Sequence, residues 1–328
     1  MALGGYRLLF QYNINYADRW AGLGNLFDFL ITFFMISTIL EFLRLGRKKF
    51  QNIRVALRNI DVIYGVNALL VPGFFLLSGY RSEFLLISLP IIFLFSVFVH
   101  RIGGKIFIFS IICGVFGLAA IKTLRALPGG LINIENLSYY RDYIKDVAFT
   151  GKQLWIYLFD DLTSANAANF FLNEYVESAG ISMGKNVLLP ILSVVPFLQS
   201  SFMIFFNFTP VPTSSEVFTT TINGVNYTSG LGTHIIGDLY YTFGLPGVVL
   251  LMLILGITIS LLTNKVLIKG KQSMYSLIAL SFLVGNSVYS VRVEYFFILR
   301  LISLTLIVFC CIDLLTRMLF PVPRERSV

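Results

Sequence analysis

A histidine and an aspartate lie four residues apart at the entrance of a long apolar stretch. If a helix already begins at His234, its side chain shares one face with Asp238, because residues one turn apart are neighbours on a helix. The carboxylate can then orient the imidazole, whose ordinary pKa of about 6.5 suits a general base. The alternative is a histidine that only marks a membrane interface. We therefore predict His234 and Asp238 as candidate catalytic residues.

Two arginines lie near the start of the last apolar run. Arg292 precedes the run and Arg300 lies eight residues deeper, or about 12 Å at helical rise. Eight residues leave the two side chains about 80° apart around the axis, so one face can hold both. An arginine at that depth usually faces a cavity or a partner. The alternative is that Arg292 marks the interface and Arg300 snorkels or pairs internally.

Metal and redox chemistry find little support in the sequence. Asp160 and Asp161 are adjacent carboxylates, but no accompanying set of ligands surrounds them. The three cysteines, Cys113, Cys310 and Cys311, all fall inside apolar runs, where packing explains them better than disulfides or metal ligation. We predict neither a metal nor a cofactor.

The amino-acid composition indicates that these residues lie in a membrane protein. Of the 328 residues, 56% are hydrophobic and 13% are charged, and the mean hydropathy is +0.80. Soluble domains have roughly 45–50% apolar and 25% charged residues. The net charge of +8 gathers at the ends of apolar runs, which indicates membrane orientation rather than nucleic-acid binding. We predict an all-α integral membrane protein in contact with the lipid bilayer and with no nucleic acid.

Seven apolar runs are long enough to propose membrane spans. They cover residues 24–43, 60–79, 83–99, 105–122, 244–263, 273–291 and 295–316. Basic residues crowd the link after the first run and mark it as cytoplasmic: Arg44, Arg47, Lys48, Lys49, Arg54 and Arg58. Alternation then places the C-terminus in the cytoplasm and a long loop outside. The predicted division is 1–122 for the N-terminal spans, 123–243 for the loop, and 244–328 for the C-terminal spans and tail.

The long loop is expected to be partly helical. Apolar residues recur at helical spacing between 134 and 147, and Ser164 precedes another helical pattern as a candidate N-cap. The segment 186–206 is apolar enough to be an eighth span, but crossing there would turn the later lysines outward. We interpret it as a re-entrant or interfacial element broken by Pro190 and Pro196. The N-terminus would start outside with no preceding span, so we expect a short or truncated version of a longer chain.

The stretch from Ser229 to Gly247 reads SGLGTHIIGDLYYTFGLPG and resembles the Wzy-type O-antigen and oligosaccharide repeat-unit polymerases. Members of this family often enter a span through a small or polar stretch followed by Gly, an acid, Tyr and Phe-Gly. The matching residues are Gly237, Asp238, Tyr240, Tyr241, Phe243, Gly244 and Gly247. The upstream LLPILSVVPF and the long loop stand in the matching places, so the architecture is similar over residues 120–300.

The resemblance implies a reaction at the outer face of the bacterial inner membrane. A growing glycan moves from its polyprenyl diphosphate carrier to the non-reducing sugar of another carrier-linked repeat unit, with no sugar nucleotide. Arginine forks grip phosphate oxygens in pairs, so the diphosphate is expected to contact four arginines: Arg125, Arg141, Arg292 and Arg300. Tyr240 and Tyr241 are expected to stack on sugars, although tyrosines are also common at membrane interfaces.

Other functions remain open. A flippase or transporter of lipid-linked oligosaccharide would favour internal repeats and polar residues near mid-membrane, and no repeat is detectable here. A ligase that moves finished glycan onto lipid A core would be built similarly. The expected partners of a polymerase are the polyprenyl-diphosphate-linked oligosaccharide, a chain-length regulator and the flippase.

Overall fold

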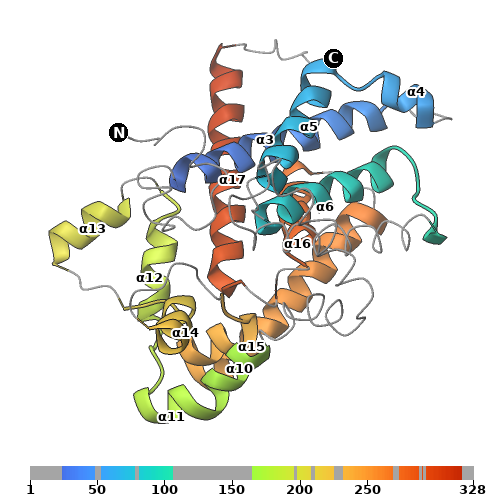
Figure 1. The fold of residues 1–328 in the computed structure, drawn as a ribbon. Helices are drawn as coiled ribbons and strands as arrows, with labels where there is room; N and C mark the ends of the chain where they lie inside the picture. Colours follow the sequence, from blue (N-terminus) through green and yellow to red (C-terminus); the bar gives the residue numbers. More distant parts are fainter. Residues whose placement is uncertain are drawn as a thin grey trace, which may run out of the picture.

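The computed structural model describes residues 24–48, 53–77, 81–105, 165–195, 198–207, 211–224, 232–268, 273–287, 290 and 293–319. Every regular element in this part of the chain is a helix (Figure 1). The first group comprises α3 (Gly24–Gly46), α4 (Ile53–Arg58), α5 (Val62–Leu77) and α6 (Arg81–Phe98). The middle group comprises α10 (Ala165–Phe170), η4 (Phe171–Tyr175), α11 (Val176–Ala179), α12 (Lys185–Leu192), α13 (Leu198–Phe206) and α14 (Ser214–Asn223). The last group comprises α15 (Ile235–Thr263), η5 (Asn264–Ile268), α16 (Met274–Asn286) and α17 (Tyr295–Leu319).

Three of these helices are long and apolar enough to cross a membrane. They contribute the candidate spans Asp28–Gly46, Ile235–Leu267 and Tyr295–Leu319. Three shorter apolar helices, Val62–Leu76, Ser82–Phe98 and Met274–Asn286, coincide with further predicted spans. The predicted span 105–122 lies outside the described residues except for Lys105. The chain thus has the architecture of a helical membrane protein, and the number seven stays a prediction.

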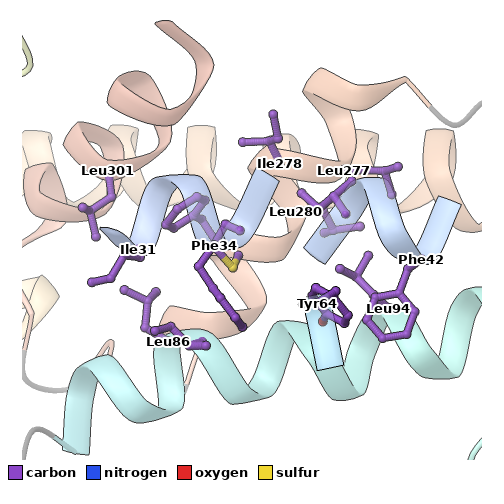
Figure 2. Close-up of a cluster of buried hydrophobic side chains, with 14 of the residues drawn as sticks. Ile31, Phe34, Phe42, Tyr64, Leu86, Leu94, Leu277, Ile278, Leu280 and Leu301 are labelled. Atoms are coloured by element: carbon purple, nitrogen blue, oxygen red, sulfur yellow. The ribbon is translucent and has the colours of Figure 1, made fainter. Parts of the chain in front are cut away.

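The main hydrophobic core forms around α3 (Figure 2). Its buried residues Ile31, Met35, Phe42 and Leu45 recur at the spacing that keeps one helix face turned inward. Against this face pack Tyr64 of α5, Leu86 and Leu94 of α6, Leu277, Ile278 and Leu280 of α16, and Leu301 of α17. Helix α3 therefore lies in the middle of this core, between α5, α6, α16 and α17.

Two local contacts show how closely the helices of this bundle approach. A Cβ atom on Gly285 of α16 would lie only 2.6 Å from the backbone oxygen of Leu86 on α6, so glycine permits the approach. Thr32 on α3 and Thr305 on α17 are fully buried, and their hydroxyl groups are 3.2 Å apart in a hydrogen bond. This bond satisfies polar groups that the core would otherwise leave unpaired.

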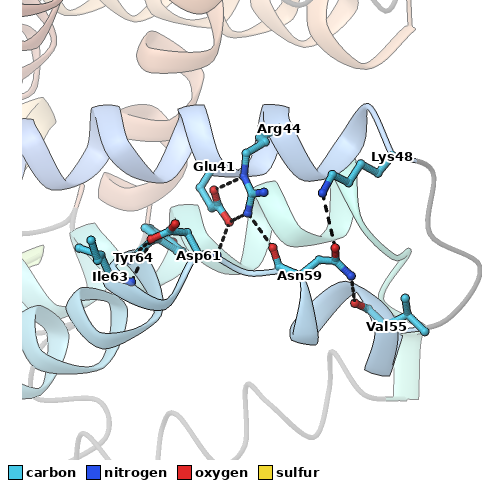
Figure 3. Close-up of polar contacts among 8 residues, drawn as sticks. All are labelled: Glu41, Arg44, Lys48, Val55, Asn59, Asp61, Ile63 and Tyr64. Atoms are coloured by element: carbon cyan, nitrogen blue, oxygen red, sulfur yellow. Dashed lines mark hydrogen bonds and ion pairs between the residues drawn. The ribbon is translucent and has the colours of Figure 1, made fainter.

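A polar cluster fixes the link between α3 and α5 (Figure 3). The Glu41 carboxylate accepts hydrogen bonds from Arg44 at 2.5 and 2.7 Å and from the Asp61 backbone N–H at 2.9 Å. Arg44 also donates to the Asn59 carbonyl at 2.6 Å. Asp61 in turn caps α5 by accepting from the backbone N–H groups of Ile63 and Tyr64. The buried acid thus neutralises one of the arginines of this basic link.

The segment 186–206 forms two short helices. α12 has 8 residues with Pro190 inside it, and α13 has 9 residues. Helices of this length extend only about 12–14 Å, less than half of a hydrocarbon core of about 30 Å. The interpretation of this segment as a re-entrant or interfacial element stays a prediction.

Several helices of the long loop, among them α10, η4 and α14, pack against the start of α15. Figure 1 shows α10, α11 and α14 gathered beside α15, away from the bundle around α3. Phe170, Phe171, Val217, Phe218 and Tyr241 form a shared core between α10, η4, α14 and α15. The loop therefore packs on the stretch of chain that carries His234 and Asp238.

Candidate functional site

The helix that carries the candidate residues is sharply kinked. Gly244 inside α15 has φ 70° and ψ −168°, a backbone conformation that residues with a Cβ atom rarely adopt. Pro246 follows two residues later and has no N–H to donate. The kink falls at the predicted boundary between loop and C-terminal spans. Before it, α15 is largely buried against the loop; beyond it, residues such as Leu245, Val249 and Leu253 are exposed.

The carbonyl groups freed by the kink find donors on the loop. The Thr242 carbonyl would bond to residue 246 in a regular helix, but that residue is proline and lacks the donor. The backbone N–H of Gly184 donates to it at 3.2 Å, and the N–H of Ser182 donates to the Tyr241 carbonyl at 2.9 Å. Broken helices in membranes require such partners. The segment 182–184 supplies them here.

A chain of side-chain hydrogen bonds strengthens this junction. The Asn186 amide donates to the Thr242 hydroxyl at 2.9 Å, and that hydroxyl donates to the Asp238 backbone carbonyl at 2.6 Å. Ser182 donates to the other end of the Asn186 amide. Asn186 and Thr242 are buried, and buried polar groups that are fully paired hold one geometry.

The carboxylate of Asp238 lies where three helices meet. Its side chain is only 2% exposed. One oxygen accepts a hydrogen bond from the Ser214 hydroxyl of α14 at 2.5 Å, and the other accepts from the backbone N–H of Tyr295, the first residue of α17, at 3.0 Å. The structure does not show the expected pairing with His234: the carboxylate accepts from Ser214 and Tyr295 instead.

The reason lies in where α15 begins. His234 is the N-cap of the helix, with φ −103° and ψ 140°, so it is extended and does not share a helical face with the residue four positions later. Its Nδ1 atom accepts a hydrogen bond from the Ile236 backbone N–H at 3.1 Å. Accepting at Nδ1 assigns the proton of the neutral ring to Nε2. Burial lowers the pKa of the imidazole, which favours this neutral form.

A second acid, not predicted from the sequence, stands beside this site. Glu294 accepts a hydrogen bond from the backbone N–H of Ser215 at 3.2 Å, next to the serine that binds Asp238. Burial raises the pKa of the Glu294 carboxyl, contacts with Thr213 and Ser215 lower it, and the neighbouring Glu216 raises it. Two acids therefore bind the start of α14: Asp238 of α15 contacts Ser214, and Glu294, the residue before α17, contacts Ser215.

The two tyrosines of the motif differ in their surroundings. Tyr241 is buried, packs its ring 5.4 Å from that of Phe171 and 5.7 Å from that of Tyr175, and donates from its hydroxyl to the Pro212 carbonyl at 3.2 Å. The ring of Tyr241 is part of the loop core, so neither of its faces is free to stack on a sugar as expected. Tyr240 is half-buried, and its predicted role stays a prediction.

The predicted diphosphate-binding arginines are described only in part. Arg125, Arg141 and Arg292 lie outside the described residues. Arg300 pairs internally, since its Nη2 atom lies 2.5 Å from an oxygen of Asp28 on α3. The two side chains are 18% and 15% exposed, and the Nε atom of Arg300 is buried without a hydrogen-bond partner. The arginine is therefore held as one member of an interhelical ion pair.

Some of the site was detectable in the sequence and some was not. The run Thr213-Ser-Ser-Glu216 has the residues of a capping box, and the structure forms both of its hydrogen bonds. This signal would have placed Ser214 at the start of a helix. Glu294 and Asp28 gave no such signal, because their partners lie 79 and 272 residues away.

Within the described residues, no group of three or more His, Cys, Asp or Glu side chains is arranged to hold a metal ion. Comparison of the chain with known protein families, with curated proteins and with solved structures found no match. Fold and site together define a helical membrane protein with a folded loop packed on a kinked span.

Proposed function

We propose that this protein is a polymerase of polyprenyl-diphosphate-linked oligosaccharide repeat units. The observation that carries the proposal is the packing of the loop helices on the kinked start of α15, the stretch that resembles the Wzy-type polymerases. Membrane proteins often build substrate sites at broken helices, where backbone and side chains meet at a defined depth. The loop then supplies the part of the site that lies outside the bilayer.

The reaction is a single glycosyl transfer. A hydroxyl oxygen on the non-reducing sugar of one carrier-linked unit forms a bond to the anomeric carbon of the growing glycan. The bond from that carbon to the diphosphate breaks, and the diphosphate leaves on its polyprenyl carrier with the bonding electrons. The hydroxyl proton passes to the departing diphosphate. Because the leaving group gathers negative charge, cations and N–H donors around it lower the barrier.

The residues proposed for this task are basic or donating. Arg125, Arg141 and Arg292 are proposed to hold the diphosphate, since the guanidinium fork suits phosphate oxygens. The Nε2–H of His234 is proposed as a further donor to a phosphate or sugar oxygen, because its Nδ1 atom is engaged by the helix backbone. Arg300 is not assigned to the diphosphate, because Asp28 already pairs with it.

The proposed location is the inner membrane of a bacterium, with the C-terminus in the cytoplasm. The basic link after α3 supports this orientation, since Arg47, Lys48 and Arg58 are exposed there. A flippase that delivers lipid-linked units to the outer face and a regulator of chain length are the proposed partners. Neither a metal nor a cofactor is part of the proposed reaction.

The test is the surface polysaccharide of a deletion strain. Loss of a polymerase leaves glycans that carry a single capped repeat unit, and the wild-type gene restores the ladder of longer products. Complete absence of capped glycan would point instead to a ligase or flippase, and a changed length distribution to a regulator. His234→Ala, matched to wild type in protein level, should shorten the ladder, whereas His100→Ala on the far side of the proposed membrane should leave it unchanged.

A further inference from the structure

We infer that Asp238 is a positioning residue: with Ser214 and the backbone of Tyr295 it forms a latch that holds α14 and α17 against the first half of α15. The activity part of the test rests on the proposed polymerase function, whereas the structural part does not. The latch is defined by two hydrogen bonds, one from the Ser214 hydroxyl and one from the Tyr295 N–H.

The latch joins the starts of two helices through one carboxylate. Ser214 and Tyr295 are the first residues of α14 and α17, and backbone N–H groups in the first turn of a helix have no partner within that helix. Asp238 supplies the missing acceptor for Tyr295 from a neighbouring helix. An acidic group at a helix start also interacts favourably with the helix dipole.

Two further hydrogen bonds connect the residues of the latch to α14 and to the part of α15 beyond the kink. Glu294 accepts from the Ser215 N–H at 3.2 Å, so α14 is held at two successive residues. The Tyr295 hydroxyl donates to the Leu251 carbonyl at 3.3 Å. Leu251 lies beyond Gly244 and Asp238 lies before it, so Tyr295 contacts both halves of the broken helix. The angle of the kink and the place of α14 are therefore set together.

The same geometry argues against Asp238 as a general base. A base must come within about 2.6–3.2 Å of the proton it removes, but this carboxylate is 2% exposed and both of its oxygens are engaged. Because so little of Asp238 is exposed, a substrate hydroxyl could reach it only if the neighbouring helices moved apart. His234, which stands one turn earlier, is more exposed and receives its position from the helix that the latch holds.

Asparagine and leucine at position 238 separate the two roles. An asparagine oxygen can still accept from the Tyr295 N–H, and its NH₂ can donate to the Ser214 hydroxyl, which both donates and accepts. Asparagine cannot act as a base. Leucine keeps the branched shape but is bulkier, and it removes both bonds. Ser214→Ala removes one bond without adding bulk, and Ser214→Thr keeps the hydroxyl.

The experiment measures latch geometry and polymer on the same variants of the full chain. Spin labels at exposed Asn223 on α14 and Asn264 at the end of α15 report their separation by pulsed electron resonance in lipid nanodiscs, with Cys113, Cys310 and Cys311 replaced by serine. We expect one narrow distance for wild type, Asp238→Asn and Ser214→Thr, and a broadened distribution for Asp238→Leu and Ser214→Ala. In the deletion strain the first group should keep the ladder within about two-fold, while the second loses roughly ten-fold or more.

Three results would overturn the inference. The first is an unchanged distance distribution in both Asp238→Leu and Ser214→Ala. The second is an Asp238→Asn variant that keeps the wild-type distance but makes as little polymer as Asp238→Leu, since that identifies a base. The third is a broadened distribution in Asp238→Asn, which shows that hydrogen bonding does not hold the helices. If wild type itself makes no ladder, the polymerase proposal fails and the distance measurement alone decides the latch.

Discussion

Breaking the ion pair between Arg300 and Asp28 is expected to destabilise the protein, whereas replacing both residues together is not. The guanidinium and carboxylate atoms are 2.5 Å apart and the side chains are 18% and 15% exposed. Removing one member leaves a charge in a nearly buried site, which costs about 3–5 kcal/mol in comparable pairs. Because some solvent reaches this pair, we expect about 3 kcal/mol for Asp28→Leu and for Arg300→Met.

The double variant should recover most of this loss. It leaves no unpaired charge, and it also removes the Nε atom of Arg300 that has no partner. Exchanging a buried pair for apolar residues of similar volume is often neutral or stabilising, so we expect stability within about 1 kcal/mol of wild type. The assay is reversible unfolding in micelles followed by circular dichroism, with the polysaccharide ladder measured in parallel.

The same helix offers a matched control. Arg317 and Asp313 form an ion pair at 2.9 Å on α17, but their side chains are 75% and 33% exposed. Replacing Arg317 with Met should cost no more than about 1 kcal/mol, as is usual for surface pairs. A double variant at 28 and 300 that is as unstable as its two single variants combined would refute a coupled ion pair at this site. A double variant that is stable but makes no polymer would return Arg300 to the diphosphate site.

Three further predictions concern backbone and protonation. Gly244→Ala should cost about 1–3 kcal/mol, because a positive φ combined with a ψ near 180° is essentially confined to glycine, and a smaller loss of thermal stability would argue against the kink. Gly285→Ala should cost about 1–3 kcal/mol, because its Cβ would meet the Leu86 carbonyl; Gly256→Ala, with open space around it, is the control and should not destabilise. Burial raises the pKa of Glu294 in the folded state, so its contribution to stability is full below the ordinary value of 4.5 and is lost as the pH rises through the folded pKa. Glu294→Gln should therefore flatten the fall in unfolding temperature between pH 4.5 and the folded pKa. An equal slope in both proteins over that interval would contradict the assignment.

Local patterns predicted helices where the structure has them. The face of α3 that carries Ile31, Met35 and Phe42 is a direct consequence of helical periodicity, and it became the centre of the core. The kink at Gly244 was not predicted, although the run Phe-Gly-Leu-Pro-Gly carries its signal, because glycine permits a positive φ and proline removes a donor. Such features depend on residues close together in the chain.

Contacts between distant residues leave no local pattern in the sequence. The pairing of Asp28 with Arg300 joins residues 272 positions apart, and no periodicity encodes it. The prediction for His234 and Asp238 assumed that the helix already begins at the histidine, but His234 is an extended N-cap. The helix begins one residue later than the prediction assumed, and Asp238 therefore has other partners than His234. Helix boundaries are the least certain part of a sequence-based prediction.

The most direct test of the polymerase proposal uses the purified protein in proteoliposomes with a synthetic polyprenyl-diphosphate-linked repeat unit and no sugar nucleotide. We expect glycans that grow in steps of one repeat unit, together with one released polyprenyl diphosphate for each step. The ladder should disappear when the protein is omitted. Unchanged repeat units, with or without movement across the bilayer, would contradict the proposed polymerase function.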